Sequence, residues 1–181
     1  SSGTTSQKKS KHYVDCLKFY EKSISLCFER FWGKIDNYRF FCLTPNKKDA
    51  PRSSLVHMCD FFVKKTKDLE SGFYLKKNKK LLIDINKSKR DNQPFIIIGL
   101  SFAILDFAEK SKIDLNGGYI IETGGMKNRR DEMIREKFYT ILKKKFKLNS
   151  IQSEYGMTEL LSQSYSLKNG EFESPPWKRI L

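Results

Sequence analysis

The sequence predicts an α/β fold in which a mostly parallel sheet is flanked by helices. In the second half of the chain, short apolar runs with strand composition alternate with segments of helical period. The order strand, helix, strand, helix, strand is typical of parallel sheets, whose strands are apolar on both faces because helices cover them. No repeat or low-complexity linker divides the 181 residues, which suffice for one buried core. Residues 1–181 are therefore expected to form a single α/β domain.

The first half predicts two helices around one strand. Residues 1–9 are a loop of small and polar residues that leads into a long amphipathic helix. Apolar positions recur in that helix every three or four residues, at Tyr13, Leu17, Tyr20, Ile24, Cys27 and Phe31. Residues 38–43 are an aromatic and apolar run closed by Thr44-Pro45-Asn46, which predicts a buried strand. A second helix follows, with Leu55, Cys59 and Phe62 on one face.

Predicted strands and helices alternate more clearly in the second half of the chain. Residues 64–92 fit a strand or a short helix equally well, so both assignments stay open. The elements that follow are, in order, a strand at 95–99, a helix at 102–110, a strand at 119–122, a helix at 130–146 and a strand at 150–154. The last helix is expected to face the core with Ile134, Phe138, Ile141 and Phe146. Residues 173–178 are expected to be irregular.

Net charge and hydropathy indicate which partners the protein is expected to have and whether it spans a membrane. The 35 Lys and Arg against 21 Asp and Glu leave a net charge of +14, which suggests an anionic partner such as a nucleotide, a nucleic acid or an anionic lipid surface. The lysines are scattered in short runs among Ile, Asn and Phe, which favours a solvated surface over a nucleic-acid site. No stretch approaches the roughly 18 apolar residues of a membrane span, so we expect a soluble protein.

Cysteine and histidine usage favours a reducing compartment. Cys16, Cys27, Cys42 and Cys59 lie in apolar segments, with no C-x-x-C pair and no secretion signal ahead of them. We expect them to be reduced, buried and inert thiols of the core. His12 and His57 are the only histidines, and the usual zinc-ligand spacings are missing. These features predict a cytoplasmic protein without a zinc site.

Open parallel sheets bind ligands beyond the carboxyl ends of their strands, which makes three segments candidates for function. They are Gly99-Leu100-Ser101, Thr123-Gly124-Gly125-Met126-Lys127 and Glu154-Tyr155-Gly156-Met157-Thr158-Glu159. In the last segment, the tyrosine ring can stack on a base, the glycine permits close backbone approach, and the carboxylate suits Mg²⁺. The two glycines of the second segment either admit a flat ligand or only make a tight turn.

The loop at residues 1–9 is a fourth candidate. Its Ser, Gly and Thr residues followed by lysines offer backbone N–H groups, hydroxyls and ammonium groups to a triphosphate, although it is not a Walker A motif. A disordered terminus or a cloning remnant is the alternative interpretation.

Taken together, the Ser-Gly-Thr-Thr loop and the distant Tyr-Gly-Met-Thr-Glu motif resemble the phosphate loop and the adenine and Mg²⁺ motif of the adenylate-forming (AMP-binding) superfamily, which includes acyl-CoA synthetases and luciferases. Further segments are similar to one branch, the bioluminescence-type acyl-protein synthetases, or long-chain-fatty-acid–protein ligases. They are Ser53-Ser54-Leu55-Val56, residues 99–103, residues 121–127, residues 155–163 and Pro175-Pro176-Trp177. The resemblance spans nearly the whole chain.

This resemblance implies ATP-dependent activation of a fatty acid or other carboxylic acid as an acyl-adenylate, followed by acyl transfer to a cysteine thiol of an acceptor protein. The residues that would hold the ATP phosphates are Ser2, Gly3, Thr4, Thr5 and Lys8 or Lys9. The residues that would surround adenine are Gly124, Gly125, Tyr155 and Gly156. Thr158 would contact the α-phosphate and Glu159 would bind Mg²⁺. The expected acyl pocket lies around Ser101, Phe102, Ala103 and Leu160.

The chain departs from the family pattern in three places. Ser6-Gln7 stands where the family loop continues with glycine, so the register of the lysines stays open. The family's segment ahead of the loop is absent. The chain also ends before the family's ribose-binding aspartate and the C-terminal domain with its catalytic lysine. We therefore expect a central piece of a longer enzyme or a truncated relative, whose uncovered apolar faces would favour self-association.

Three alternatives stay open. A carboxylate–CoA ligase of the phenylacetate type shares the nucleotide motifs and differs in the acceptor. A non-catalytic relative would keep the fold and bind nucleotide without turnover. A basic module for nucleic acid or an acidic protein would use the charge of the surface instead of the loops.

Overall fold

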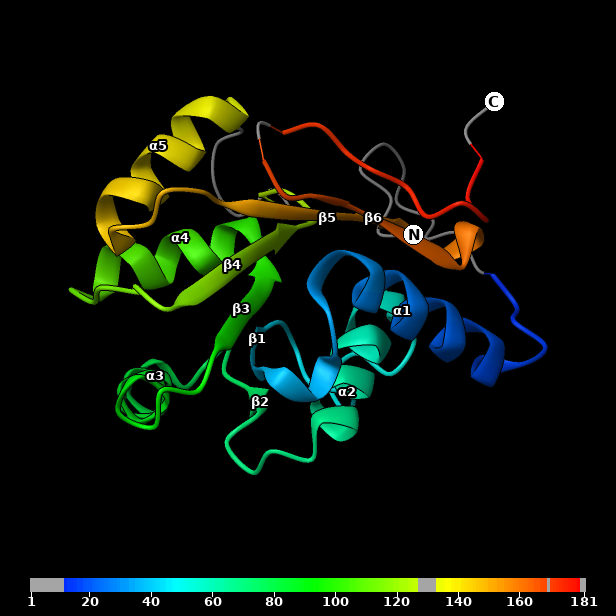
Figure 1. Ribbon diagram of the computed structural model, residues 1–181, viewed down its shortest axis with the longest axis horizontal. Helices are drawn as coiled ribbons and strands as arrows, with labels where there is room; N and C mark the ends of the chain where they lie inside the picture. Colours follow the sequence, from blue (N-terminus) through cyan, green and yellow to red (C-terminus); the bar gives the residue numbers. More distant parts are fainter. Residues whose placement is uncertain (1–11, 127–132, 169, 180–181) are drawn as a thin grey trace.

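The computed structural model describes residues 12–126, 133–168 and 170–179. Across these residues, a six-stranded sheet lies between two layers of helices (Figure 1). The strands are β1 (Arg39–Leu43), β2 (Gly72–Phe73), β3 (Phe95–Leu100), β4 (Gly118–Thr123), β5 (Gln152–Met157) and β6 (Ser162–Ser166). Their spatial order is β2-β1-β3-β4-β5-β6, and each neighbouring pair is parallel except β5 and β6, which are antiparallel. The predicted α/β class with a mostly parallel sheet is confirmed.

The helices divide between the two faces of the sheet. Helices α1 (Leu17–Trp32) and α2 (Ser54–Thr66) pack on one face, over strand residues such as Phe40 and Ile98. Helices α3 (Asn78–Arg90), α4 (Ser101–Lys110) and α5 (Arg135–Phe146) pack on the other, over Phe41 and Ile97. Successive strand residues point to opposite faces, so a strand covered on both sides has to be apolar throughout. Short 3-10 helices lie at Ile35–Asn37 (η1) and Thr158–Leu160 (η2).

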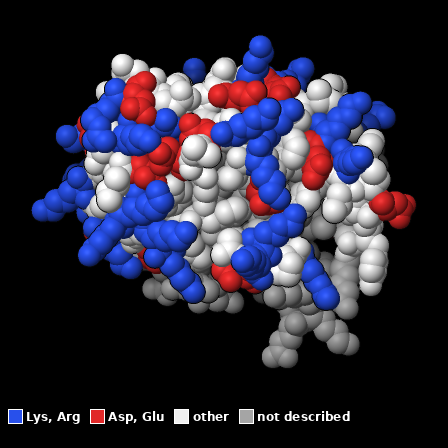
Figure 2. Space-filling model, turned by 90° about the horizontal axis from the view of Figure 1, so that it is seen from below, with Lys and Arg blue, Asp and Glu red and all other residues white. Residues whose placement is uncertain are grey.

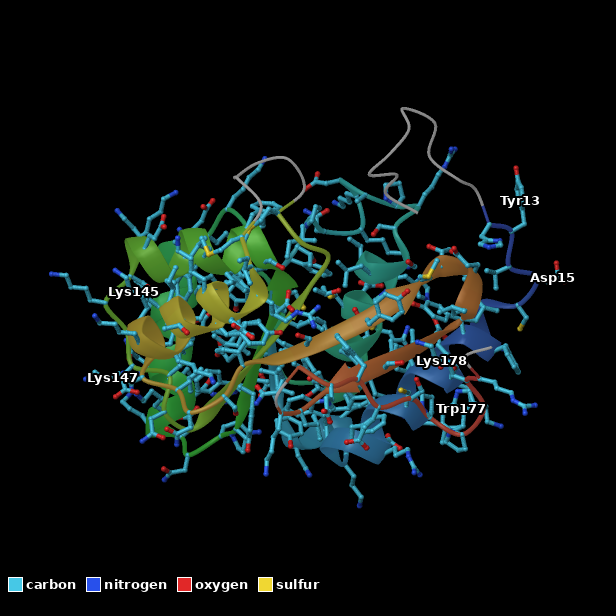
Figure 3. All side chains as sticks on the ribbon, turned by 90° about the horizontal axis from the view of Figure 1, so that it is seen from above. Tyr13, Asp15, Lys145, Lys147, Trp177 and Lys178 are labelled. Carbon is cyan, nitrogen blue, oxygen red and sulfur yellow. The ribbon has the colours of Figure 1, made fainter. Side chains whose placement is uncertain are left out.

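The C-terminal part of the described chain folds back over the β5–β6 hairpin. Glu173 pairs with Tyr165 of β6 in an antiparallel bridge. Further along, the Trp177 Nε1 donates to Ser23 Oγ of α1 at 3.3 Å, and the Lys178 Nζ donates to Ser164 Oγ of β6 at 2.7 Å. Figure 3 shows Trp177 and Lys178 beside this hairpin, away from Lys145 and Lys147 at the far end of α5. Residues 173–178 are therefore irregular, as predicted, and tied to the sheet.

Several elements differ from their predicted form. The undecided stretch at 64–92 contains the short strand β2 and helix α3, and the polar strand β6 was not predicted. Helix α4 starts at Ser101, directly after β3, so the predicted loop at 99–101 does not exist. Strand β5 runs to Met157, which makes part of the predicted loop at 154–159 a strand. Parallel pairing with β4 and antiparallel pairing with β6 extend this strand beyond its apolar residues.

Two predictions about burial are wrong. Ile134 was expected to face the core, but it precedes α5, which starts at Arg135, and is 77% exposed. The buried residues of α5 are Phe138, Leu142 and Phe146. Residues 130–132 of the predicted helix lie outside the described residues. Cys16 is exposed at the start of α1, whereas Cys27, Cys42 and Cys59 are buried thiols as expected.

The surface distributes its basic residues among acidic ones. Figure 2 shows Lys and Arg side chains interrupted by Asp and Glu across one face. Lys64 pairs with Asp60 at 2.7 Å and Lys80 with Asp84 at 2.7 Å. None of the described helices combines the length and apolar character needed to cross a bilayer.

Gly99 is required by the packing of β1 against β3. A Cβ at this position would lie 2.6 Å from the Leu43 Cβ and 2.9 Å from the Leu43 carbonyl oxygen, so the two strands would have to separate. We expect Gly99→Ala to lower the free energy of unfolding by about 1–3 kcal/mol, the usual effect of overpacking a core. Gly72→Ala is the matched control, because its Cβ would only reach the Tyr74 ring at 3.7 Å. Urea denaturation that finds both variants equally stable would contradict this packing.

Candidate functional site

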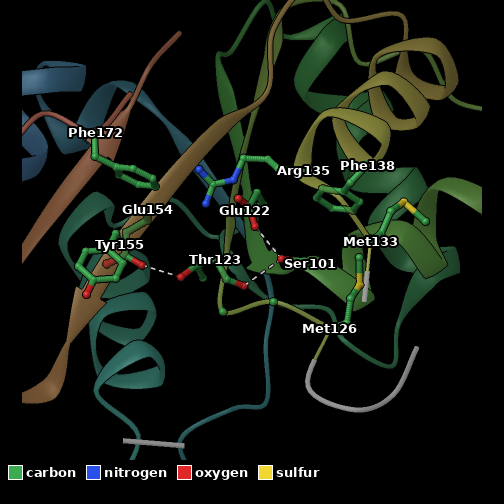
Figure 4. Close-up of a pocket in the computed structure, with 12 residues that line it drawn as sticks. Ser101, Glu122, Thr123, Met126, Met133, Arg135, Phe138, Glu154, Tyr155 and Phe172 are labelled. Atoms are coloured by element: carbon green, nitrogen blue, oxygen red, sulfur yellow. Dashed lines mark hydrogen bonds between the residues drawn. The ribbon is translucent and has the colours of Figure 1, made fainter. Parts of the chain in front are cut away.

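A cavity of about 180 Å³ opens at the carboxyl ends of β4 and β5 (Figure 4). Its walls come from the end of β3 and start of α4, from β4 and the turn after it, from α5, from β5 and from the C-terminal segment. The lining residues are Ser101, Glu122, Thr123, Gly124, Gly125, Met126, Met133, Arg135, Phe138, Glu154, Tyr155 and Phe172. Parallel sheets bind ligands at this edge, so the cavity is the candidate site.

The Glu122 carboxylate accepts the hydrogen bonds that connect the parts of the cavity wall nearest α4 and α5. In the described part of the chain, three hydroxyl groups donate to its carboxylate: Ser101 Oγ at 2.6 Å, Ser153 Oγ at 2.6 Å and Tyr139 OH at 3.0 Å. Ser153 is the register partner of Glu122 across β4 and β5, and its hydroxyl also contacts that of Tyr139. Burial, and then the carboxylate of Glu122, raise the pKa of Tyr139 to about 12, which keeps its proton available for donation.

Glu154 occupies the opposite face of the sheet. It lies across from Tyr165, which belongs to the core under α1 and α2. Thr123 Oγ1 donates to its Oε2 at 2.7 Å. Burial is the main reason why the pKa of Glu154 is raised to about 7. A Cβ on Gly156 would lie 2.5 Å from the Glu154 Oε1, so a larger residue here would make the end of the Glu154 side chain shift.

Tyr155 forms an aromatic surface with the C-terminal segment. Its side chain is 47% exposed, and the ring meets Phe172 edge-on with centroids 5.9 Å apart. The Arg135 guanidinium lies 5.3 Å from the Phe172 ring, and Figure 4 shows Arg135 reaching from α5 towards it. The Lys178 Nζ lies 4.9 Å from the centre of the Tyr155 ring. Arg135 and Lys178 therefore lie at the two ends of the aromatic pair formed by Phe172 and Tyr155.

The structure brings together some of the predicted site residues. Ser101, Gly124, Gly125 and Tyr155 line the same cavity, although they come from three separate segments of the sequence. Phe102 and Ala103 belong to α4, where they are buried in the core and do not line the cavity. The predicted residues Ser2, Gly3, Thr4, Thr5, Lys8, Lys9 and Lys127 lie outside the described residues.

The motif residues after Gly156 continue into η2. Thr158 Oγ1 lies 3.1 Å from Ser54 Oγ at the start of α2. Glu159 Oε2 lies 3.9 Å from the Nε2 of His12, which follows the predicted phosphate loop in the sequence. Leu160 is partly exposed beside them and does not line the cavity. Thr158 and Glu159 thus lie where α2 begins, close to the first described residue, and they do not line the cavity.

Sequence reasoning missed the polar residues that support the site. Glu122, Tyr139, Ser153 and Glu154 had no assigned role, and neither did Arg135. One signal was present, because Glu122 follows Tyr119-Ile120-Ile121 within a buried strand, where a charge needs partners. The identity of those partners depends on strand register and on the position of α5.

A metal cage is absent from the described residues, where no group of three or more His, Cys, Asp or Glu side chains is placed to hold an ion. Any metal at this edge would therefore need a substrate to supply most of its ligands. Mg²⁺ commonly binds in this way, through one or two carboxylates together with phosphate oxygens and water.

No model of a known protein family matches the chain, and no curated protein or solved structure matches it significantly. What the site does is therefore inferred from its own residues.

The raised pKa of Glu154 predicts a change in stability with pH. Between its ordinary pKa of 4.5 and about 7, the folded protein holds a proton that the unfolded chain has lost. The free energy of unfolding should fall as the pH rises through this window, by about 3 kcal/mol from this group. Glu154→Gln removes the titration, so its stability relative to the wild type should increase from pH 5 to pH 8.

Urea denaturation at both pH values measures this difference. Glu171→Gln serves as the control, because Glu171 is exposed. If the difference in the free energy of unfolding between Glu154→Gln and the wild type is the same at pH 5 and pH 8, the Glu154 carboxyl does not titrate as its burial requires.

Proposed function

We propose that the chain is the nucleotide-binding part of an adenylate-forming enzyme, closest to the acyl-protein synthetases that activate fatty acids. The main support is that Gly124, Gly125 and Tyr155 line one cavity at the carboxyl edge of a parallel sheet, with Ser101 across from them. Parallel pairing of β3, β4 and β5 brings these segments to one edge of the sheet. An adenine site built from both motifs needs this meeting, although Gly156 itself does not line the cavity.

The glycine pair suits a wall beside a flat base. Gly124 has φ 76° and Gly125 has φ 64°, a left-handed conformation that glycine adopts without strain. No described atom lies within 4 Å of the place where a Cβ on Gly125 would be. The turn thus explains why two glycines are present, and the open space beside Gly125 lets a ligand approach its backbone. The half-exposed ring of Tyr155 supplies a surface for stacking.

The phosphate end of the proposed site lies towards α2. Ser53 caps this helix by accepting from the Val56 N–H at 3.3 Å, and Ser54 contacts Thr158. The N-terminus of a 13-residue helix carries partial positive charge and unpaired N–H groups, which favour phosphate nearby. The Glu159 side chain is 31% exposed, and in the proposed site its carboxylate shares Mg²⁺ with the nucleotide. The ion would neutralise charge on the phosphates.

The proposed reaction has two steps. A carboxylate oxygen of the fatty or other carboxylic acid attacks the α-phosphorus of ATP, the bond to the bridging oxygen breaks, and pyrophosphate leaves. The thiol of an acceptor protein then attacks the acyl carbon, loses its proton, and releases AMP. The residues of this chain orient the base through Tyr155 and the glycines, and the Thr158 hydroxyl donates to the α-phosphate as negative charge develops there.

The surface supports a small anionic ligand over a nucleic acid. Acidic residues interrupt the basic ones on the face in Figure 2, and several lysines are already paired with them. A nucleic-acid site usually presents a basic patch or stripe along one face. The net charge alone therefore does not indicate a nucleic-acid site.

Calorimetric titration with ATP, with and without Mg²⁺, tests the proposal. We expect the wild type to bind ATP more tightly when Mg²⁺ is present. Glu159→Gln should lose this Mg²⁺ dependence while keeping the fold, because it removes one ligand charge at the surface. Glu171→Gln is the matched control and should behave as the wild type. A single-stranded oligonucleotide is titrated in parallel, and binding of the oligonucleotide without ATP would favour a basic module instead.

A further inference from the structure

Lys178 lies on the same face of the β5–β6 hairpin as Tyr155. Tyr155 and Ser164 are register partners, so their side chains share one face of the hairpin. The Lys178 Nζ donates to Ser164 Oγ at 2.7 Å and lies 4.9 Å from the centre of the Tyr155 ring. Pairing of Glu173 with Tyr165 and the bond from Trp177 to Ser23 hold the segment that leads to Lys178. The ammonium is therefore held beside Tyr155 by the fold.

The charge of Lys178 lacks a close partner of opposite sign. Within residues 12–126, 133–168 and 170–179, no carboxylate oxygen comes within 4.0 Å of its Nζ, whereas Lys64 and Lys80 each have one at 2.7 Å. Burial lowers the pKa of Lys178, and the more distant Glu154 and then Cys27 work against this effect. A partly buried cation is stabilised by an incoming anion more than a solvated surface lysine is.

The ammonium also has unused hydrogen-bonding capacity. It carries three N–H donors, and Ser164 takes one of them. Its contact with the Tyr155 ring uses charge and leaves donors unpaired. The four-carbon stem lets the head group move while the backbone stays in place. The group is thus ready to exchange its ring contact for an oxyanion.

We infer that Lys178 is a further ligand-binding residue of the proposed nucleotide site, and that its ammonium binds a phosphate of the nucleotide whose base lies on Tyr155. The inference rests on the proposed function. Without ligand, the ammonium covers the aromatic ring. When the nucleotide binds, the base takes the ring and the ammonium turns to the phosphate, which supplies the oxyanion that the described residues do not provide.

Titration of ATP and of adenosine separates the role of charge from that of stacking. Lys178→Met should weaken ATP binding about 10- to 100-fold, the scale of a hydrogen bond to a charged group, and leave adenosine binding within about twofold. Lys178→Arg should retain most of the ATP affinity, because it keeps the charge. Tyr155→Ala should weaken both ligands by a similar factor, since both carry the base.

Lys168→Met is the matched control, because Lys168 is an exposed lysine in the segment that follows β6. Circular dichroism and thermal unfolding confirm that each variant is folded. Equal losses for ATP and adenosine in Lys178→Met would overturn the inference and make Lys178 a residue that only positions the ring. Unchanged ATP affinity would overturn it as well. If the wild type binds neither ligand, the proposed function itself is contradicted. If the wild type binds ATP and Lys178→Met binds it equally well, only the inference about Lys178 is contradicted.

Discussion

The buried carboxylate of Glu122 fixes the carboxyl edge of the sheet. Its oxygens accept hydroxyl hydrogen bonds from the start of α4, from α5 and from β5, and an unpaired charge at this depth would cost several kcal/mol. The same bonds place the candidate site. Gly124 follows Glu122 by two residues on the chain, and Tyr155 follows Ser153 by two, so both are positioned by the strands that Glu122 holds together. The cavity between them depends on this arrangement.

Glu122 and Glu154 have different roles on opposite faces of the sheet. Glu122 is satisfied by hydroxyl donors and acts as a structural centre. Glu154 has Thr123 as its hydrogen-bond donor, and its pKa is raised by burial. Arg135 and Lys178 add positive charge beside the aromatic side of the cavity. A ligand that carries both a flat ring and negative charge matches these features better than a purely apolar one.

The sequence could predict elements whose character is set locally. All residues of β1 are buried, and parallel strands covered on both faces appear as continuous apolar runs, which is why β1, β3 and β4 were predicted. Strand β6 alternates serine with Gln163 and Tyr165, and its burial comes from α1 and from the C-terminal segment. Gly124, Gly125 and Tyr155 were predicted from their own chemistry. The partners of Glu122 were not, because strand register and the packing of α5 bring them together.

The most direct test of the proposed nucleotide site is two-dimensional NMR of the ¹⁵N-labelled chain titrated with ATP and Mg²⁺. The backbone amides of Gly124, Gly125 and Gly156 report on the edge of the sheet where the two motifs meet. If ATP binds as proposed, these amides and that of Tyr155 shift most, and they saturate together. Saturating ATP that leaves them unchanged, or that shifts mainly the lysine-rich surface of α3, would contradict the proposal and place the ligand elsewhere.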